Sequence, residues 1–209
     1  MKLTVFGATG GTGEQVVRQA CEAGDEVTAV VRDPARLRVA YPNLTVVRAD
    51  VMDPASIESA IAGRDAVVTA IGPRDTKPTT VTADSTASIV KAMAATGVRR
   101  LVTVSNSGMF TDGDDPVSRL IVKPIVWRFL KHAWNDALRA EEVVRTSDLD
   151  WTMARPPRLT DKPRTGSYRT AVGRNVLGGF TVSRADVADL ILRCLGDPGT
   201  IRTAVSLAN

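Results

Sequence analysis

The chain has 209 residues and is 44% hydrophobic, so it can bury a core without disulfide staples, and we expect one domain over residues 1–209. Its 27 Lys and Arg residues exceed its 23 Asp and Glu residues only slightly, and the two signs are interspersed, which disfavours a nucleic-acid partner. The sequence contains no apolar run of 18 residues, so it predicts no membrane span. No apolar leader opens the chain, so we expect a cytoplasmic protein. We also expect a monomer or a small homo-oligomer.

Short apolar runs rich in β-branched residues recur along the chain and predict strands buried on both faces of a sheet. Amphipathic segments with apolar residues three or four apart separate these runs and predict helices. Such alternation predicts an α/β fold, in which a parallel sheet is covered by helices on both faces. The predicted strands span residues 3–6, 26–31, 44–49, 65–71, 99–105 and 150–154.

A glycine-rich loop follows the first predicted strand directly. In VFGATGGTGE, Gly7, Gly10 and Gly13 stand three apart, and a predicted helix begins among them. Glycine permits a sharp turn, a close approach of backbone amides to a ligand and close contact between helix and sheet. The helix N-terminus offers unpaired N–H groups to a pyrophosphate. The loop therefore predicts a Rossmann-type, doubly wound sheet that binds a dinucleotide, the alternative being a tight turn without a ligand.

Arg32 ends the second predicted strand, nineteen residues after Gly13, where this fold reads the adenosine ribose. An acidic residue there suits NAD, whereas an Arg suits the 2′-phosphate of NADP, so we expect NADP(H) as cofactor. A solvated pair with Asp33 is the alternative for Arg32. Asp50, which closes the third strand, could accept from the adenine amino group or cap a turn, and Arg74, after the fourth strand, could contact the same phosphate.

Residues 109–134 gather aromatic and aliphatic side chains after the fifth predicted strand, and three interpretations are open for them. The segment could be an apolar lid over a planar ligand, an ordinary core helix, or an amphipathic surface that contacts a subunit or a membrane. Pro124 must kink or divide it. His132, the only histidine, could donate a proton, although a lone helical His is more often structural.

Two helix starts and the state of the two cysteines can also be predicted from the sequence. Asp53 before Pro54 and Ser183 with Asp186 each predict a helix start. Cys21 and Cys194 lie in predicted helices without a second metal ligand at suitable spacing, so we expect two buried thiols and no metal site.

Five stretches carry a resemblance to a known family: GATGGTG, VVRDPARL, AIGPRDTKPTTV, RRLVTVSNSG and DWTMARPPRLTDKPRTGSY. They resemble the atypical short-chain dehydrogenase/reductases, and among them the NAD(P)H-binding flavin reductases of the biliverdin IXβ reductase type. The resemblance covers nearly the whole chain. It implies cofactor contacts from the glycine loop, the ribose-phosphate arginines, the backbone beside the nicotinamide and a proline pair, which here are Gly7, Thr9, Gly10, Thr12, Gly13, Arg32, Gly72, Arg74, Pro156 and Pro157. Together with Gly11 of the same loop and Asp50, these residues make up the predicted cofactor site.

The chain also departs from that family. The wider superfamily uses a Tyr with a Lys four residues later, but neither Tyr41 nor Tyr168 has such a Lys. Where the flavin reductases place a serine and a histidine at the substrate, this chain aligns Asn106 and Arg158, and Ser105 lies next to Asn106. We therefore expect neither alcohol oxidation by the Tyr/Lys route nor biliverdin as the substrate.

Hydride transfer to a flavin or quinone needs no dedicated acid, because the proton can come from water. We therefore expect an NADPH-dependent reductase of a planar acceptor bound by the loops after the fifth and sixth strands, with Ser105, Asn106 and Arg158 steering or polarising the acceptor. The alternative is a non-catalytic sensor of NADP(H) that resembles the NmrA-like regulators.

Overall fold

The computed structural model describes residues 1–73 and 75–209. An eight-stranded sheet runs through the molecule in the order β3-β2-β1-β4-β5-β6-β10-β8, and a two-stranded sheet pairs β7 with β9. The strands are β1 (Lys2–Phe6), β2 (Glu26–Val31), β3 (Leu44–Arg48), β4 (Ala66–Thr69), β5 (Arg100–Val104), β6 (Asp150–Arg155), β7 (Arg158–Thr160), β8 (Arg169–Val172), β9 (Thr181–Ser183) and β10 (Thr203–Ala208).

The strand order reverses between β1 and β4, which both pair with their neighbours in parallel. In this register Phe6 lies opposite Val30 of β2 and Thr69 of β4, so three carboxyl ends meet at one edge of the sheet. Ligands of doubly wound sheets bind at such a switch point. The expected Rossmann-type α/β fold is confirmed, and the six predicted strands correspond to β1–β6.

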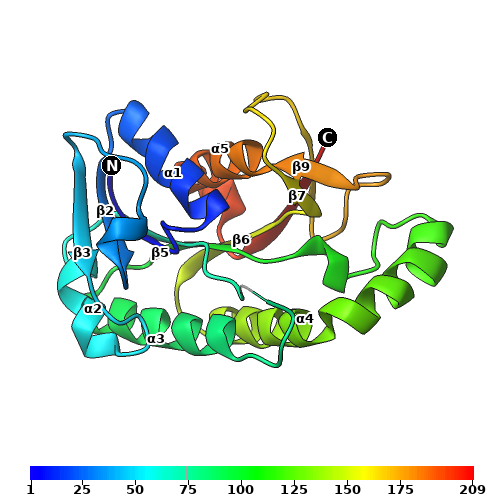
Figure 1. The fold of residues 1–209 in the computed structure, drawn as a ribbon, viewed down its shortest axis with the longest axis horizontal. Coiled ribbons are helices and arrows are strands. Elements are labelled where there is room, and N and C mark those ends of the chain that lie inside the picture. Colours follow the sequence, from blue (N-terminus) through cyan, green and yellow to red (C-terminus); the bar gives the residue numbers. More distant parts are fainter. Residues whose placement is uncertain (74) are drawn as a thin grey trace.

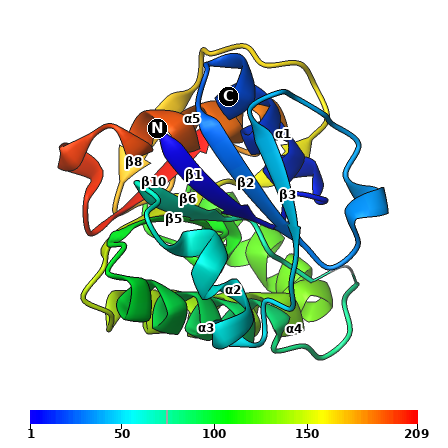
Figure 2. The same cartoon turned by 90° about the vertical axis from the view of Figure 1, so that its left-hand side faces the viewer.

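Helices cover both faces of the sheet (Figures 1 and 2). The upper layer of Figure 1 contains α1 and α5, whereas α2, α3 and α4 form the lower layer. Short 3₁₀ turns occur at Pro34–Arg36, Ser107–Met109 and Pro198–Thr200, and a π-helical turn at Ser118–Val122 leads into α4. The helices are α1 (Gly11–Glu22), α2 (Pro54–Ile61), α3 (Val81–Thr96), α4 (Lys123–Arg145) and α5 (Arg184–Leu195).

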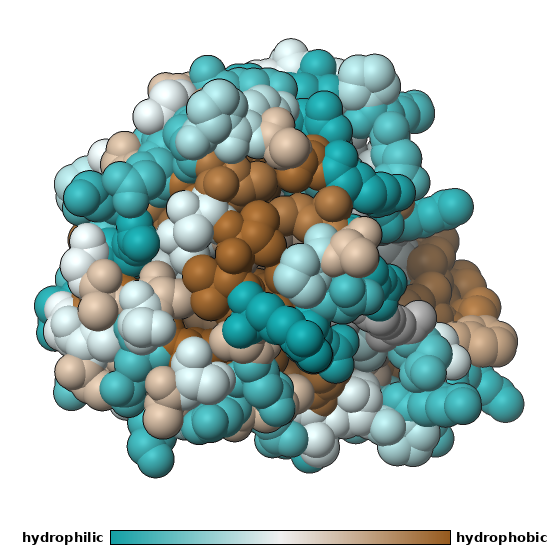
Figure 3. Space-filling view, turned by 60° about the vertical axis from the view of Figure 1, so that its left-hand side comes forward, coloured by the Kyte–Doolittle hydropathy of each residue, from teal (hydrophilic) through white to brown (hydrophobic). Residues whose placement is uncertain are grey.

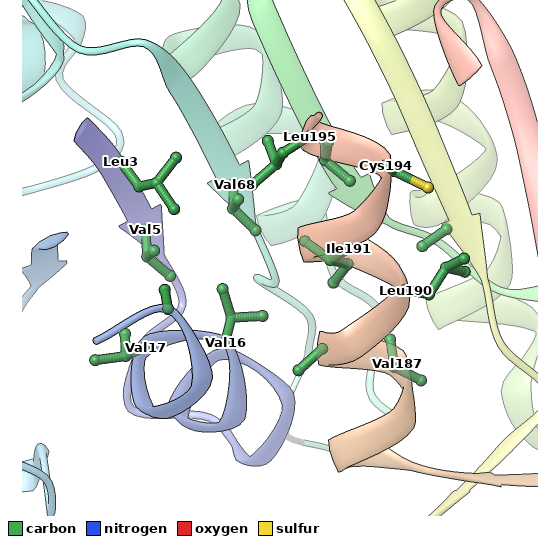
Figure 4. Packing of buried hydrophobic residues seen from close by; sticks show 14 of the residues in the cluster. Leu3, Val5, Val16, Val17, Val68, Val187, Leu190, Ile191, Cys194 and Leu195 are labelled. Carbon is green, nitrogen blue, oxygen red and sulfur yellow. The ribbon is translucent and has the colours of Figure 1, made fainter. Parts of the chain in front are cut away.

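Aliphatic side chains from the sheet, α1 and α5 fill the space between them (Figure 4). Val5 of β1, Val16 of α1 and Ile191 of α5 are fully buried in this cluster. A second cluster, with Phe6, lies under α2 and α3. Consecutive residues of β1 thus face opposite layers, which explains why apolar residues occur on both faces of the strand.

Both predicted helix starts are confirmed. The carboxylate of Asp53 accepts a hydrogen bond from Ala55 N at the start of α2, and Ser183 Oγ accepts one from Asp186 N at the start of α5. Each bond satisfies an N–H of the first turn that has no partner within the helix.

The structure corrects two expectations about the sheet. The prediction that all strands are buried on both faces is wrong for β3, which lies at the edge and leaves Val46 41% exposed. Figure 3 brings this side of the molecule forward and shows apolar surface in the middle of the face. The sheet is also not wholly parallel, because β8 pairs antiparallel with β10. Within the described residues, no helix is both long and apolar enough to cross a membrane.

Candidate functional site

The three glycines of the first loop have different structural roles. Gly7 ends β1 with a φ of +79°, and a Cβ on it would lie 2.6 Å from the backbone of Ala70. Gly13 lies in the first turn of α1, where a Cβ would come within 2.7 Å of the Gly7 backbone. Gly10 is exposed and extended, with φ −91°, and only Gly7 O lies within 4 Å of its Cβ position. Gly7 and Gly13 therefore allow close backbone contact, whereas Gly10 faces open space.

The N-terminus of α1 points into that space with its donors available. Gly10 is the N-cap and no side chain caps the helix, so the first N–H groups have no acceptor within it. Their partial positive charges form the positive end of the helix dipole, which attracts an anion.

A groove of about 610 Å³ opens over this helix start at the switch point of the sheet, and we call it the loop groove. Gly13 lies behind the loop and does not line it. Of the residues predicted from the sequence to hold a cofactor, the groove is lined by Gly7, Thr9, Gly10, Gly11, Thr12, Arg32, Asp50 and Gly72.

Arg32 directly follows β2, is exposed and lines the groove. Asp33, its suggested partner, instead accepts a hydrogen bond from Ala35 N, and no ion pair to Arg32 occurs among the described residues. Asp50 lines the groove while one of its oxygens accepts a bond from Met52 N at 3.0 Å, so it caps a turn there. Arg74 lies outside the described residues.

A second cavity of about 470 Å³, the side pocket, lies beside the carboxyl ends of β5 and β6. Ser105, Asn106, Pro156, Pro157 and Arg158 all line it, so the structure brings the predicted acceptor residues and the proline pair together. Further walls come from α4 and from the loop between β8 and β9, including Val126, Leu130, Trp134, Asn175 and Phe180.

A buried ion pair fixes Ser105. Its hydroxyl donates to Glu141 of α4 at 2.5 Å, and the same carboxylate accepts from Arg155 of β6 at 2.9 Å. Glu141 and Arg155 are each only 4% exposed, and the Arg155 guanidinium lies 3.5 Å from the ring centroid of Phe110. Because the Ser105 proton is committed to Glu141, its oxygen can offer only lone pairs to a ligand. Ser105 is thus suited to accept a hydrogen bond from an N–H or O–H group of a ligand.

Asn106 and Arg158 instead offer hydrogen-bond donors to the side pocket. The side-chain oxygen of Asn106 accepts a bond from Gly108 N at 2.6 Å, which leaves its NH₂ group for a ligand. Arg158 is exposed and has no ion pair within the described part of the chain. Trp134 is 95% buried, and its indole N–H has no partner among the described residues. The pocket therefore combines apolar walls with a few donors.

The segment of residues 109–134 has two sides. Its inner side contributes Val122, Val126 and Leu130 to the wall of the side pocket, as a lid would. Its outer side is exposed, with Leu120 71% and Phe129 68% accessible. The interpretation of the segment as an ordinary core helix is therefore wrong. Pro124 lies in the first turn of α4, where the π-helical turn gives way to α-helix, so it marks a division as expected.

Arg184 lines both cavities and was not predicted from the sequence as a site residue. It is the first residue of α5, and its Cδ lies 2.6 Å from the Cβ position of Gly11. Its guanidinium is 2.6 Å from the carboxylate of Asp161. No local pattern indicates this role, because Arg184 is 173 positions from Gly11 and reaches the loop only through the fold. Arg36, in the turn after β2, also lines the loop groove and was missed.

The other titratable candidates lie elsewhere. Tyr41 donates to Glu22 and Tyr168 donates to Asp189, and neither lines a cavity described above. Burial and the bond to Asp189 raise the pKa of Tyr168 above its usual range. His132 lines a separate, open hollow with Thr79 and Thr80.

The prediction of two buried thiols is confirmed. Cys21 is 6% and Cys194 2% exposed. Burial, with Asp25 and Glu22 nearby, raises the pKa of Cys21 to about 11, and burial also raises the pKa of Cys194. Both thiols therefore stay protonated at neutral pH and are poor nucleophiles.

Comparisons with known proteins agree with the geometry of the loop groove. A protein-family profile described as NAD(P)H-binding matches residues 7–198. The uncharacterized protein YwnB of Bacillus subtilis is 28% identical over 206 residues, covering 95% of this chain and 93% of the relative. The (4-alkanoyl-5-oxo-2,5-dihydrofuran-3-yl)methyl phosphate reductase of Streptomyces griseus is 31% identical over 196 residues, covering 90% of this chain and 60% of that enzyme.

Solved structures share the fold over the full length of the chain. A protein from Burkholderia pseudomallei is 29% identical with a TM-score of 0.83, and all of both chains is covered. A short-chain dehydrogenase/reductase from Veillonella parvula in complex with NADP is 20% identical, with a TM-score of 0.85, and the match covers 100% of this chain and 94% of that one. At that identity the second likeness extends to the fold alone.

Proposed function

The chain belongs to the NAD(P)H-binding family, and from this premise we propose that it is an NADPH-dependent reductase that transfers hydride to a flavin, quinone or similar planar acceptor. One observation carries the proposal: the loop groove and the side pocket meet at Arg184, which lines both. A dinucleotide in the groove and an acceptor in the pocket would therefore be neighbours. Hydride transfer requires such contact between the two reactants and little else from the protein.

The loop groove fits a dinucleotide on its own geometry. Gly10 leaves room where any side chain would intrude, and the uncapped N-terminus of α1 supplies N–H groups for a pyrophosphate. Arg32 would bind the 2′-phosphate of NADPH, with Arg36 as a second cation at the same end of the groove. Gly72 would approach the nicotinamide ribose through its backbone. Bound NADPH supplies the hydride.

The side pocket fits a planar acceptor that carries a few polar atoms. The NH₂ group of Asn106 and the guanidinium of Arg158 would bind carbonyl oxygens on which negative charge develops as hydride arrives. The oxygen of Ser105 would accept from an N–H of the acceptor, held in place by Glu141. Pro156 and Pro157 would form a flat apolar wall.

The proton that balances the reaction would come from water. One NADPH and one proton convert the acceptor to its two-electron reduced form and release NADP⁺. Both tyrosine hydroxyls donate hydrogen bonds to carboxylates, so neither is placed to protonate an alkoxide as in carbonyl reduction. The reductase activity of the Streptomyces griseus relative is consistent with hydride chemistry on this scaffold.

The proposal is tested by following the loss of NADPH absorbance with flavin mononucleotide and a short-chain quinone, and by the reverse assay with secondary alcohols and NADP. We expect turnover with at least one planar acceptor and little or none with alcohols. Tight NADPH binding without turnover on any acceptor would contradict the proposal and favour the sensor. Fast alcohol oxidation would require a base that accepts the hydroxyl proton, and it would contradict the proposed reaction.

A matched pair of variants assigns the acceptor to the side pocket. Arg158→Ala removes a cation that lines the pocket, whereas Arg174→Ala removes an exposed cation that does not. We expect Arg158→Ala to lower kcat/KM for the acceptor roughly tenfold or more, with NADPH affinity unchanged, and Arg174→Ala to have no such effect.

A further inference from the structure

The net charge of the chain is concentrated in one helical segment. Residues 116–135 contain four Lys and Arg residues and no Asp or Glu. The whole chain has 27 basic and 23 acidic residues, so without these four it would carry 23 of each sign. Lys123 faces inward and pairs with Asp114 at 2.5 Å, but Arg119, Arg128 and Lys131 are exposed. No carboxylate lies within ion-pair distance of these three in the described chain.

The same segment exposes a regular row of apolar side chains. Val117, Ile121, Ile125 and Phe129 recur every four residues, which places them on one side of a helix, and we call them the exposed stripe. They are 60%, 56%, 55% and 68% accessible. The row runs from the π-helical turn into the N-terminal part of α4, which projects past the sheet at the right of Figure 1. Single exposed apolar residues need no explanation, but a contiguous row marks a contact surface.

The surrounding charge decides what this surface fits. If two copies of the chain met face to face through the exposed stripe, Arg119, Arg128 and Lys131 of one copy would approach the same cations of the other. That repulsion opposes a symmetric dimer. An anionic lipid bilayer instead offers hydrocarbon to the stripe and phosphate groups to the cations, as for amphipathic helices that lie in a membrane interface.

We propose that the exposed stripe and its three flanking cations dock this protein on the surface of an anionic lipid bilayer. The helix would lie in the plane of the membrane, with the stripe in the acyl boundary and the cations at the headgroups. The side pocket opens next to this surface, because Val122 of the segment and Phe180 line the pocket and are also exposed. If the proposed reductase function holds, docking would admit a membrane-dissolved quinone to the pocket. Docking itself does not depend on that function.

The primary test measures binding of the full chain to vesicles by sedimentation, without any enzyme assay. We expect binding to phosphatidylcholine vesicles that contain about one third phosphatidylglycerol, weak binding to phosphatidylcholine alone, and release by high salt. Because no turnover is measured, failure of docking and failure of the reductase function are separate results.

Two pairs of matched variants separate the apolar and the charged contributions. Ile121→Gln with Phe129→Gln should lower binding at least about tenfold, whereas Val46→Gln with Ile201→Gln, which change exposed apolar residues elsewhere, should not. Arg119→Gln with Arg128→Gln should lower binding roughly thirtyfold. Arg48→Gln with Lys91→Gln removes the same charge from exposed sites outside the segment and should have a much smaller effect.

Tryptophan fluorescence reports where binding occurs. Trp127 is 40% exposed within the segment, whereas Trp134 and Trp151 are each 5% exposed. Trp127 contacts the ring of Trp134 and lies on the other side of the helix from the exposed stripe. In Phe129→Trp, which places an indole in the stripe, binding to anionic vesicles should therefore shift the emission further to the blue than in the wild-type chain.

Three results would overturn the proposal. The first is no binding of the wild-type chain to anionic vesicles. The second is binding that the stripe variants leave unchanged. The third is a wild-type dimer in analytical ultracentrifugation that Ile121→Gln with Phe129→Gln converts to a monomer, with no vesicle binding, which would make the stripe an interface between copies of the chain.

Discussion

Gly10 and Gly13 belong to one loop, but substitution should affect them differently. Gly10 is exposed, has a backbone conformation open to any residue and faces the groove. We expect Gly10→Val to lower NADPH affinity at least about a hundredfold and to cost only about 1 kcal/mol of stability, because Val is a poorer N-cap than Gly. Titration calorimetry and circular dichroism measure the two effects.

Gly13→Val is the comparison for that variant. Its side chain would meet the backbone of Gly7, so it should destabilise the fold by several kcal/mol before any ligand is added. Unchanged NADPH affinity in a folded Gly10→Val protein would refute the assignment of this loop to the pyrophosphate.

Arg32 should determine the choice between the two nicotinamide cofactors. Its guanidinium is exposed in the groove and free of Asp33. A charge-assisted hydrogen bond contributes about 1.5 to 3 kcal/mol, so Arg32→Ala should weaken NADPH roughly ten- to a hundredfold while NADH affinity barely changes. Isothermal titration of both cofactors measures this difference.

Arg48→Ala serves as its control, since Arg48 is exposed on β3 and does not line the groove. An equal loss of NADPH and NADH affinity in Arg32→Ala would mean that Arg32 contacts the shared adenosine or supports the fold. A wild-type preference for NADH would rule out the NADP assignment.

At the scale of elements, the start of α5 organises the chain between β7 and β9. Asp186 is fully buried and accepts hydrogen bonds from Thr165 N at 2.8 Å, Gly166 N at 2.9 Å and Ser183 Oγ at 2.8 Å. Burial by itself would raise the pKa of Asp186, but these bonds outweigh it and hold the pKa below its ordinary value. The carboxylate thus anchors a loop to the helix that carries Arg184.

The folded state binds the carboxyl proton of Asp186 more weakly than the unfolded state does. The hydrogen bonds to the carboxylate therefore stabilise the fold fully above the unfolded pKa of about 3.9, and this stabilisation is lost as pH falls through the lower folded pKa. Asp186→Asn should therefore lower the free energy of unfolding by about 2 to 4 kcal/mol at pH 7. The difference from wild type should shrink in acid. Urea unfolding at neutral and acidic pH measures it.

Asp84→Asn controls for the helix dipole, since Asp84 is also acidic and in the first turn of a helix, α3, but is exposed. Its substitution should cost less than about 1 kcal/mol. A loss in Asp186→Asn that stays the same in acid would mean that the carboxylate charge does not account for the stabilisation.

At the scale of the whole molecule, cofactor binding and folding are linked through the sheet. The loop groove is assembled from β1, β2, β3 and β4, so it exists only when these strands are paired. NADPH at a hundred times its Kd should raise the free energy of unfolding by about 2.7 kcal/mol and the Tm by roughly 5 to 10 °C. Gly10→Val should abolish that shift in a thermal melt. A full shift in this variant would show that the cofactor binds elsewhere.

Local signals explain what the sequence predicted well. β1, β2, β4, β5 and β6 are rich in apolar residues because both of their faces are covered, and the helix starts at Asp53 and Ser183 depend on hydrogen bonds within three residues. β3 was mispredicted as buried because its apolar residues do not reveal that it lies at an edge. β8 and β10 went unpredicted, and their pairing joins residues 33 to 39 positions apart in the chain.

The sequence by itself determined the dinucleotide loop, because its turn, its helix start and its glycine spacing all lie within ten consecutive residues. Only the tertiary structure decided how the side pocket is made. Glu141 of α4 holds Ser105 after β5, and Arg184 of α5 reaches Gly11 of α1, so residues far apart in the chain become neighbours through sheet order. The physical reason is that a ligand loop is stabilised by short-range backbone geometry, whereas a pocket between layers depends on long-range contacts that no local pattern encodes.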